Sequence, residues 1–291
     1  MKKKGIIEQA LYGNDKADFS VNDYPVNRFH AFFTLLKTNW LTWIYISLIT
    51  TASFLPIYFI YTAKNAYIIS QTISMEPNLV NSFTITVNLI YSFISIPLWM
   101  IGFIILNGSI GLIRKMTFKE GFLFWSDFKA ALKSGFKNSI INSLIFSICM
   151  NLCSFNMSFI LLDKELPKIL VYSVFLVSII IMVIIMEITL LNCNLNAIYN
   201  LSVKNMYKNS FLLLFAKPLK NLLFTFIFIW PILLIIFVPN FIISIIILFF
   251  ILVFFMAMNI QILFLYSCHL FDIYINKENA KEIYRKGLRR L

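Results

Sequence analysis

Residues 221–271 read NLLFTFIFIWPILLIIFVPNFIISIIILFFILVFFMAMNIQILFLYSCHLF and contain no Asp, Glu, Lys or Arg. As a single helix this stretch would extend about 76 Å, whereas the hydrocarbon core of a bilayer is about 30 Å thick. The stretch must therefore fold back on itself. Pro239-Asn240 is the natural turn, because Pro ends a helix and Asn tolerates a turn conformation. The sequence thus predicts two membrane spans here, at 221–238 and 241–267.

Four earlier runs are also long and apolar enough to span a bilayer, at 40–62, 84–112, 139–162 and 169–191. Unpaired backbone groups cannot face lipid, so all six spans should be helices. The composition agrees, because 60% of the residues are hydrophobic and 13% are charged, whereas soluble domains have about 25% charged residues. We expect an all-α integral membrane protein, a six-helix transmembrane bundle.

Lys and Arg are distributed unevenly between these runs. Of the 25 basic residues, 22 lie in alternate connections, namely 1–39, 113–138, 192–220 and 268–291. Basic loops stay in the cytoplasm, which predicts a multi-pass protein of the cell membrane with both termini cytoplasmic. The same pattern explains the net charge of +12. Nucleic acid is excluded as a partner, because no continuous basic and aromatic soluble segment is present.

The pattern divides the chain into an N-terminal segment, 1–39, a six-span domain, 40–271, and a basic tail, 272–291. Met1–Lys4 is basic, but charged residues follow where the apolar part of a signal peptide should stand, so the first span should act as the targeting signal. The tail mixes charged residues with Ile and Leu, which predicts a solvated helix, either free or resting against the bundle.

Two segments outside the spans are amphipathic and predict the bilayer as a partner. Phe29, Phe32, Phe33 and Leu36 repeat at helical spacing before the first span, which predicts a helix lying on the membrane. Another set of apolar residues gathers on one side of a helix between the second and third spans: Phe118, Phe122, Trp125, Leu132 and Phe136. Lys129, Lys133 and Lys137 flank it and suit anionic headgroups, although Gly121 and Gly135 disfavour one continuous helix.

Charged side chains are almost absent from the predicted spans. Glu187 is the only carboxylate among them, and acids inside a membrane are candidates for proton or ion handling. It follows Ile169 by about 27 Å along a helix, near the cytoplasmic interface, so we favour a structural role with access to headgroup water. Asn142, Asn151 and Asn156 of the third span should turn toward other helices and form hydrogen bonds there.

Sites for chemistry are sparse in the sequence. There is no GxSxG, HExxH or phosphate-binding loop, so no catalytic residue is predicted. The four Cys read as small apolar side chains, and the two His do not stand in a Cys/His cluster, so neither a metal site nor a cofactor is expected.

Two stretches carry a resemblance to a known family. The first is Asn27-Arg28-Phe29-His30-Ala31-Phe32-Phe33, leading through Asn39-Trp40 to Pro56, and the second is Trp125-Ser126-Asp127-Phe128-Lys129 followed by Gly135-Phe136-Lys137-Asn138-Ser139. They resemble the YesL-like family of bacterial membrane proteins of unknown function. The resemblance covers roughly half of the chain and implies an all-helical membrane protein associated with nutrient uptake, without assigned catalytic residues.

Three functions remain open at this point. The first is a non-enzymatic accessory protein or subunit of a membrane transport system, with a membrane or ATPase partner subunit. The second is the permease subunit of an ATP-driven exporter, which also has six spans with both ends inside. The third is a membrane-embedded lipid enzyme, for which Glu187 and Asp127 would be the starting points. We favour the first, because it requires no reactive constellation.

Overall fold

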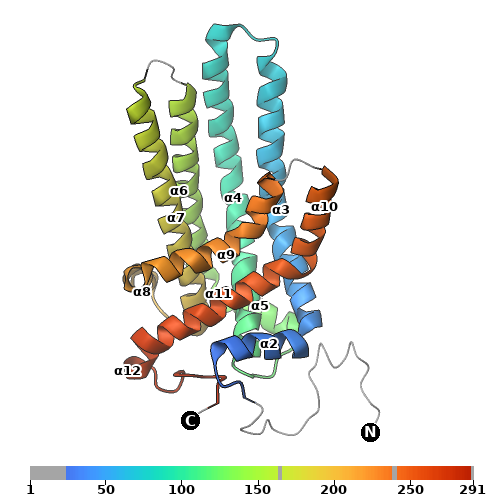
Figure 1. Cartoon of the computed structure of the whole chain (residues 1–291), viewed down its shortest axis with the longest axis vertical. Helices are drawn as coiled ribbons and strands as arrows, with labels where there is room; N and C mark the ends of the chain where they lie inside the picture. Colours follow the sequence, from blue (N-terminus) through green and yellow to red (C-terminus); the bar gives the residue numbers. More distant parts are fainter. Residues whose placement is uncertain (1–23, 163–165, 238–240, 290–291) are drawn as a thin grey trace.

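The computed structural model describes residues 24–162, 166–237 and 241–289, and this part of the chain contains helices and connecting segments but no strand. Four long helices stand side by side as two hairpins (Figure 1). They are α3 (Trp40–Thr72), α4 (Pro77–Thr117), α6 (Phe136–Leu162) and α7 (Lys168–Ile198). The helix α4 packs against α3 and α6, and α6 packs against α7, so the four form one continuous bundle.

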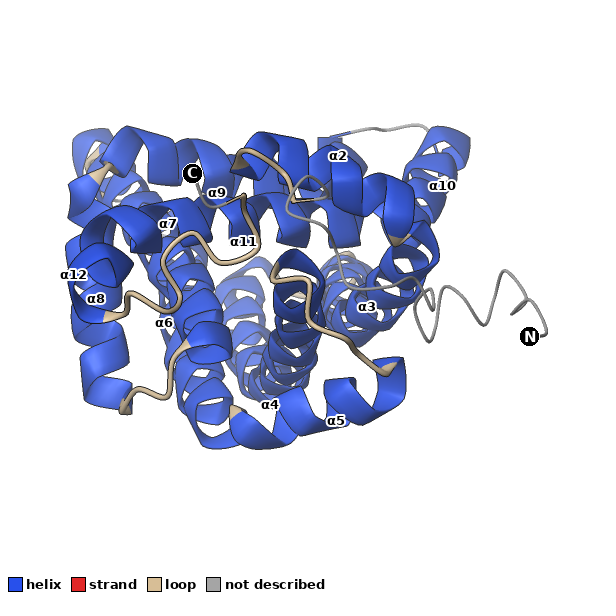
Figure 2. Ribbon diagram, turned by 90° about the horizontal axis from the view of Figure 1, so that it is seen from below, coloured by secondary structure: helices blue, strands red, loops and turns tan. Residues whose placement is uncertain are grey.

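The remaining helices gather around one end of this bundle. They are α2 (Arg28–Thr38), α5 (Phe124–Ser134), α8 (Val203–Ala216), α9 (Pro218–Phe237), α10 (Phe241–Phe250), α11 (Met256–Phe271) and α12 (Lys277–Asn279). In Figure 1, α9 and α11 cross the lower half of the long helices obliquely. Seen from below, α2 and α5 lie on opposite sides of this end (Figure 2). We call it the basal end.

The core lies where α11 crosses the bundle. Most side chains of α11 are buried, including Ile260, Phe264 and Phe271, and they contact α2, α3, α4, α7 and α9. π-helical segments, Ile251–Phe255 and Asp272–Asn276, flank α11 at both ends. A helix that is buried all round needs apolar residues on every face, and α11 meets that need with the second half of the uncharged stretch.

Among the described residues, five helices are long and apolar enough to cross a membrane: Trp40–Thr72, Asn78–Thr117, Phe136–Ile160, Lys168–Ile198 and Ile245–Asn279. A sixth is added if Val203–Ala216 and Pro218–Trp230, which are bent by 106° relative to each other, count as one span. The predicted all-α class is therefore confirmed for the described residues, and several helices have the length and apolar composition of membrane spans. The predicted turn at Pro239-Asn240 lies outside the described residues.

The helices extend beyond the predicted spans. The helix α3 continues past residue 62 to Thr72, and α4 begins at Pro77 rather than at residue 84. Polar residues such as Lys64 end the apolar run without ending the helix, because no Pro or Gly occurs between Lys64 and Pro77. Lys64 therefore lies within α3 and not in a loop.

The two amphipathic helices pack on the bundle and still expose apolar side chains that were predicted to face the membrane. In α2, Ala31 and Leu35 are buried, while Phe29, Phe33 and Leu36 of the predicted stripe are exposed. Ala31 packs with Leu265 of α11 and with Leu288 of the tail. Contact of the exposed stripe with the membrane stays a prediction.

In α5 the buried residues are Phe124 and Phe128, and the predicted Trp125 is exposed. Gly111 of α4 makes this packing possible, because a Cβ atom there would overlap the side chain of Ala131. Gly121 lies before α5 and Gly135 ends it, so the helix is short.

The tail rests against the bundle, which was one of the expected arrangements, but the predicted helix was wrong. Helix α12 ends at Asn279, and residues 280–288 form turns packed against the basal end. Leu288 is buried with Ala31 and Leu265, and the backbone N–H of Arg289 donates to the carbonyl of Pro25 at 2.9 Å. Burial of Leu288 favours this docked form over a free helix.

Candidate functional site

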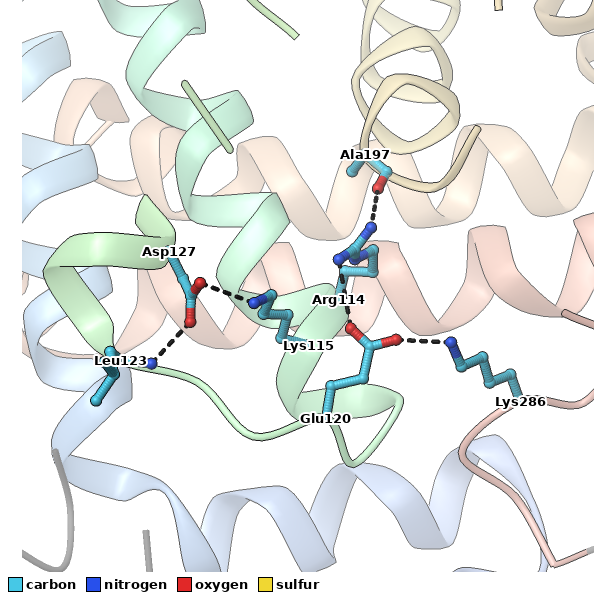
Figure 3. Close-up of polar contacts among 7 residues, drawn as sticks. All are labelled: Arg114, Lys115, Glu120, Leu123, Asp127, Ala197 and Lys286. Carbon is cyan, nitrogen blue, oxygen red and sulfur yellow. Dashed lines mark hydrogen bonds and ion pairs between the residues drawn. The ribbon is translucent and has the colours of Figure 1, made fainter. Parts of the chain in front are cut away.

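An ion-pair cluster occupies the basal end of α4 (Figure 3). Arg114 Nη2 lies 3.3 Å from Glu120 Oε2, and Lys286 Nζ of the tail lies 2.6 Å from Glu120 Oε1. Arg114 Nη1 also donates to the carbonyl of Ala197 at the end of α7, at 3.2 Å. Glu120 therefore connects α4 with the tail, and Arg114 connects α4 with α7.

The same cluster positions α5. Lys115 Nζ lies 2.7 Å from Asp127 Oδ1, and Asp127 Oδ2 accepts from the backbone N–H of Leu123 at 2.7 Å (Figure 3). Burial opposes the charged carboxylate, but the hydrogen bonds from Lys115 and Leu123 outweigh it and hold the pKa of Asp127 below its ordinary value of 3.8. Asp127 is thus an anionic anchor that fixes the start of α5 on α4.

A more deeply buried ion pair lies beside this cluster. Arg28 Nη2 contacts Asp272 Oδ2 at 2.8 Å, and the two side chains are 11% and 10% exposed. Asp272 Oδ1 also accepts from Asn276 Nδ2 and from the backbone N–H of Arg285, while Arg28 Nη1 donates to the carbonyl of Lys286. Such a pair is stabilising only with good geometry and additional hydrogen bonds, and both are present here.

An asparagine network joins α6, α7 and α8. Asn142 Nδ2 donates to the carbonyl of Thr189 at 3.1 Å and to Cys193 Sγ at 3.5 Å. Asn142 Oδ1 accepts from Asn192 Nδ2 at 3.0 Å and from the Tyr207 hydroxyl at 2.9 Å. The predicted hydrogen bonding of Asn142 to neighbouring helices is therefore confirmed.

The other two predicted asparagines differ from each other. Asn151 joins three helices, because its Oδ1 accepts from Tyr61 of α3 and Ser95 of α4, each at 3.1 Å. Its Nδ2 donates to the carbonyl of Ser92 at 3.2 Å. Asn156 is exposed and makes no hydrogen bond with the described residues, so the prediction was wrong for Asn156.

Glu187 does not lie where we expected it. Its side chain is 5% exposed, so it is buried in the bundle rather than open to headgroup water. Among the described residues it has no ion pair or hydrogen bond, and the prediction of an exposed interfacial residue was wrong. The estimate from helical rise placed Glu187 at the correct end of α7, but it could not account for coverage by neighbouring helices such as α11.

The predicted surface residues of α5, and Lys137 at the start of α6, are exposed. Trp125 is 59% exposed, and Lys129, Lys133 and Lys137 are exposed as well. Trp125, Lys129 and Lys133 are spaced four residues apart, so they lie along one side of α5. We call these three residues the α5 stripe.

Sequence reasoning missed Lys64. It lies in a shallow crevice between α3, α4 and α6, lined by Tyr61, Lys64, Asn88, Tyr91, Ser92, Ser154, Phe155 and Ser158. Lys64 Nζ donates to Asn88 Oδ1 at 2.9 Å and lies 5.3 Å from the centre of the Tyr61 ring. The signal was present in the sequence, because Lys64 and Asn88 are polar residues close to apolar runs, but their pairing depends on how two helices face each other.

These contacts do not form a reactive constellation. No contact among the described residues joins Asp127 to Glu187, the two acids considered for lipid chemistry. Within residues 24–162, 166–237 and 241–289, no three His, Cys, Asp or Glu side chains come together as metal ligands would.

Comparisons of the chain with protein-family models, curated proteins and solved structures find no match.

Proposed function

We propose that this protein is a non-enzymatic accessory protein or subunit of a membrane transport system, located in the cell membrane. It crosses the membrane six times, with both termini in the cytoplasm and the basal end on the cytoplasmic side. The basic connections support this orientation. The contact between Pro25 and Arg289 supports an even number of crossings, because two segments on opposite sides of a membrane could not meet.

The observation that carries this proposal is the α5 stripe on a fixed helix. Phe124 and Phe128 hold α5 on α4, and the ion pair between Lys115 and Asp127 fixes its start. Because α5 is already fixed in place, binding at the stripe does not require the helix to lose conformational entropy. This favours the binding of a partner. An exposed Trp followed along the same side of the helix by two exposed Lys residues suits a partner surface that has apolar groups and acidic side chains.

A pull-down from membranes in mild detergent tests the proposal. Full-length protein should retain a membrane or ATPase subunit, and the triple variant Trp125→Ala, Lys129→Gln, Lys133→Gln should lose it. Lys204→Gln with Lys208→Gln serves as the matched control, because α8 also belongs to the basal end. Retention of the same partner by the stripe variant, or the absence of any partner with the unmodified protein, would contradict the proposal.

The lipid surface is the alternative contact of the stripe, and a vesicle-binding experiment with a Lys→Gln peptide distinguishes it. Each Lys near an anionic leaflet contributes about 1 kcal/mol to membrane binding. A synthetic peptide of residues 118–137 should lose affinity for anionic vesicles when Lys129, Lys133 and Lys137 become Gln, with a smaller loss at high salt. Loss of vesicle binding together with an unchanged pull-down would assign the stripe to lipid.

A permease subunit of an ATP-driven exporter is the second candidate. Buried amide atoms without hydrogen-bond partners among the described residues favour it: Asn107 Oδ1, Asn194 Oδ1, both amide atoms of Asn259, and Gln261 Oε1. Buried polar groups are almost always hydrogen-bonded, so these atoms suit water or a polar solute inside the bundle. Transport by the purified protein with its ATPase, abolished by Asn259→Leu, would favour this function.

The resemblance to the YesL-like family forms part of this proposal. It is based on Asn27–Phe33 and Trp125–Lys129, and the second of these contains both Asp127 and the start of the α5 stripe. A nutrient-uptake system is accordingly the kind of transport system that we propose.

A further inference from the structure

We infer that the Lys64 crevice binds a phosphate group at the end of the bundle opposite the basal end. The crevice is formed by α3, α4 and α6, and its empty volume of about 220 Å³ includes the space open to the surroundings. It encloses no space that a water molecule could occupy, so a phosphate group would lie across its surface, in contact with the side chains at its rim.

Several hydrogen-bond donors in this crevice have no partner among the described residues. Lys64 has three N–H donors and uses one on Asn88 Oδ1. The hydroxyls of Tyr91, Ser92 and Ser154, and the amide nitrogen of Asn88, have no hydrogen-bond partner among the described residues. Several free donors around one cation suit a ligand that has only acceptor atoms, such as a phosphate group.

The charge of Lys64 also favours an anionic ligand. The residues that line the crevice include no Asp or Glu, and Lys64 forms no ion pair within the described part of the chain. The neutral oxygen of Asn88 orients the ammonium group but does not neutralise it. An anion from outside the protein would therefore gain both a charge partner and several hydrogen bonds.

Lys64 lies at the level of the membrane where phosphate groups are found. Lys64 follows Trp40 by 24 residues of one helix, or about 36 Å, compared with about 30 Å of hydrocarbon and 40–45 Å for the bilayer with its headgroups. If Trp40 lies at one interface, where Trp is enriched, Lys64 lies at the headgroup level of the other. Lipid phosphate and free phosphate in the surrounding water both reach this level.

The experiment measures thermal shifts of the full-length protein in a nonionic detergent. The probes are dioctanoyl phosphatidylglycerol, inorganic phosphate, and dioctanoylglycerol, which has the same acyl chains without phosphate. The unmodified protein should show a saturable shift with phosphatidylglycerol and none with dioctanoylglycerol. Lys64→Gln should weaken the apparent affinity by about tenfold or more, since hydrogen bonds to charged groups are among the stronger ones. A shift with inorganic phosphate of equal size would identify free phosphate as the source, and its absence would identify the lipid headgroup.

Two further variants separate binding from folding. Lys168→Gln removes an exposed Lys at the start of α7 and should leave the affinity unchanged. Ser154→Ala deletes a single hydroxyl and should weaken binding by about threefold or more, which provides a result even if Lys64→Gln does not fold. Equal affinity in Lys64→Gln and the unmodified protein, an equal loss in Lys168→Gln, or no saturable shift with either phosphate probe would overturn the inference.

Discussion

Asn142 joins three helices through a single side-chain amide. Replacing it with Ala removes its contacts with Thr189, Cys193, Asn192 and Tyr207. Hydrogen bonds inside membrane proteins contribute about 0.6 kcal/mol each on average, so we expect Asn142→Ala to lower the free energy of unfolding by about 2 kcal/mol. Denaturation in detergent micelles measures this change. Asn156→Ala, an exposed position of the same helix, is the matched control and should change stability by less than about 0.5 kcal/mol. Equal effects of the two variants would show that the network contributes nothing.

Removing the charge of Glu187, unlike removing the amide of Asn142, should not lower the stability of the protein. A buried carboxylate without a cationic partner pays for desolvation and recovers little of that energy. Glu187→Gln keeps the shape and removes the charge, so this variant should unfold at the same temperature as the unmodified protein or at a higher one. Glu187→Lys should unfold at a lower temperature, because it buries a longer side chain with a charge. Marked destabilisation by Gln would instead reveal a bound cation or proton that the carboxylate holds.

Individual helices show which part of the fold is readable from sequence. The positions of α2 and α5 follow from apolar spacing, but their buried faces do not, because the neighbouring surface selects the face. Gly111 of α4 determines how α5 packs, and only the three-dimensional fold brings Gly111 to Ala131. The α5 stripe was predictable because Trp125 and the Lys residues lie on a short amphipathic helix. Lys64 and the Arg28–Asp272 pair were not, because each depends on a contact between helices.

The tail segment depends on one glycine. Gly287 has a φ of +79°, and a Cβ atom there would overlap the carbonyl of Thr117 at the end of α4. Gly287→Ala should therefore destabilise the docked tail by about 1–3 kcal/mol, because it combines backbone strain with a steric clash. Limited proteolysis should show faster cleavage within residues 280–288.

Gly121→Ala is the control for this variant. A Cβ atom at Gly121 meets no other atom within 4 Å, so proteolysis of the tail should not change. If Gly287→Ala and Gly121→Ala were cleaved at the same rate as the unmodified protein, tail docking would not depend on this close approach.

The arrangement of the whole molecule in the membrane is testable with reporter fusions. A reporter placed after Ser74 or Leu166 should lie outside the cell, and one placed after Gly121 or Asn209 should lie in the cytoplasm, because basic connections remain inside. A reporter after Asn240, which lies outside the described residues, should also be external if α9 and the helix from α10 to α11 both cross. A cytoplasmic position at Asn240 would leave four crossings, with α9 and α10 entering and leaving on the same side.

The ion pair between Arg28 and Asp272 also has a consequence for biosynthesis. Its partners are 244 positions apart, and the ribosome makes a chain from its N-terminus, so Arg28 emerges long before Asp272 exists. If the N-terminus has the proposed cytoplasmic orientation, Arg28 is a free cation beside the first span while α3 inserts, and it adds to the basic signal that sets this orientation. Only after α11 has been made does the same guanidinium become a buried structural group. In the proposed topology, Arg28 would therefore act first in orienting the nascent protein and later in closing the finished one.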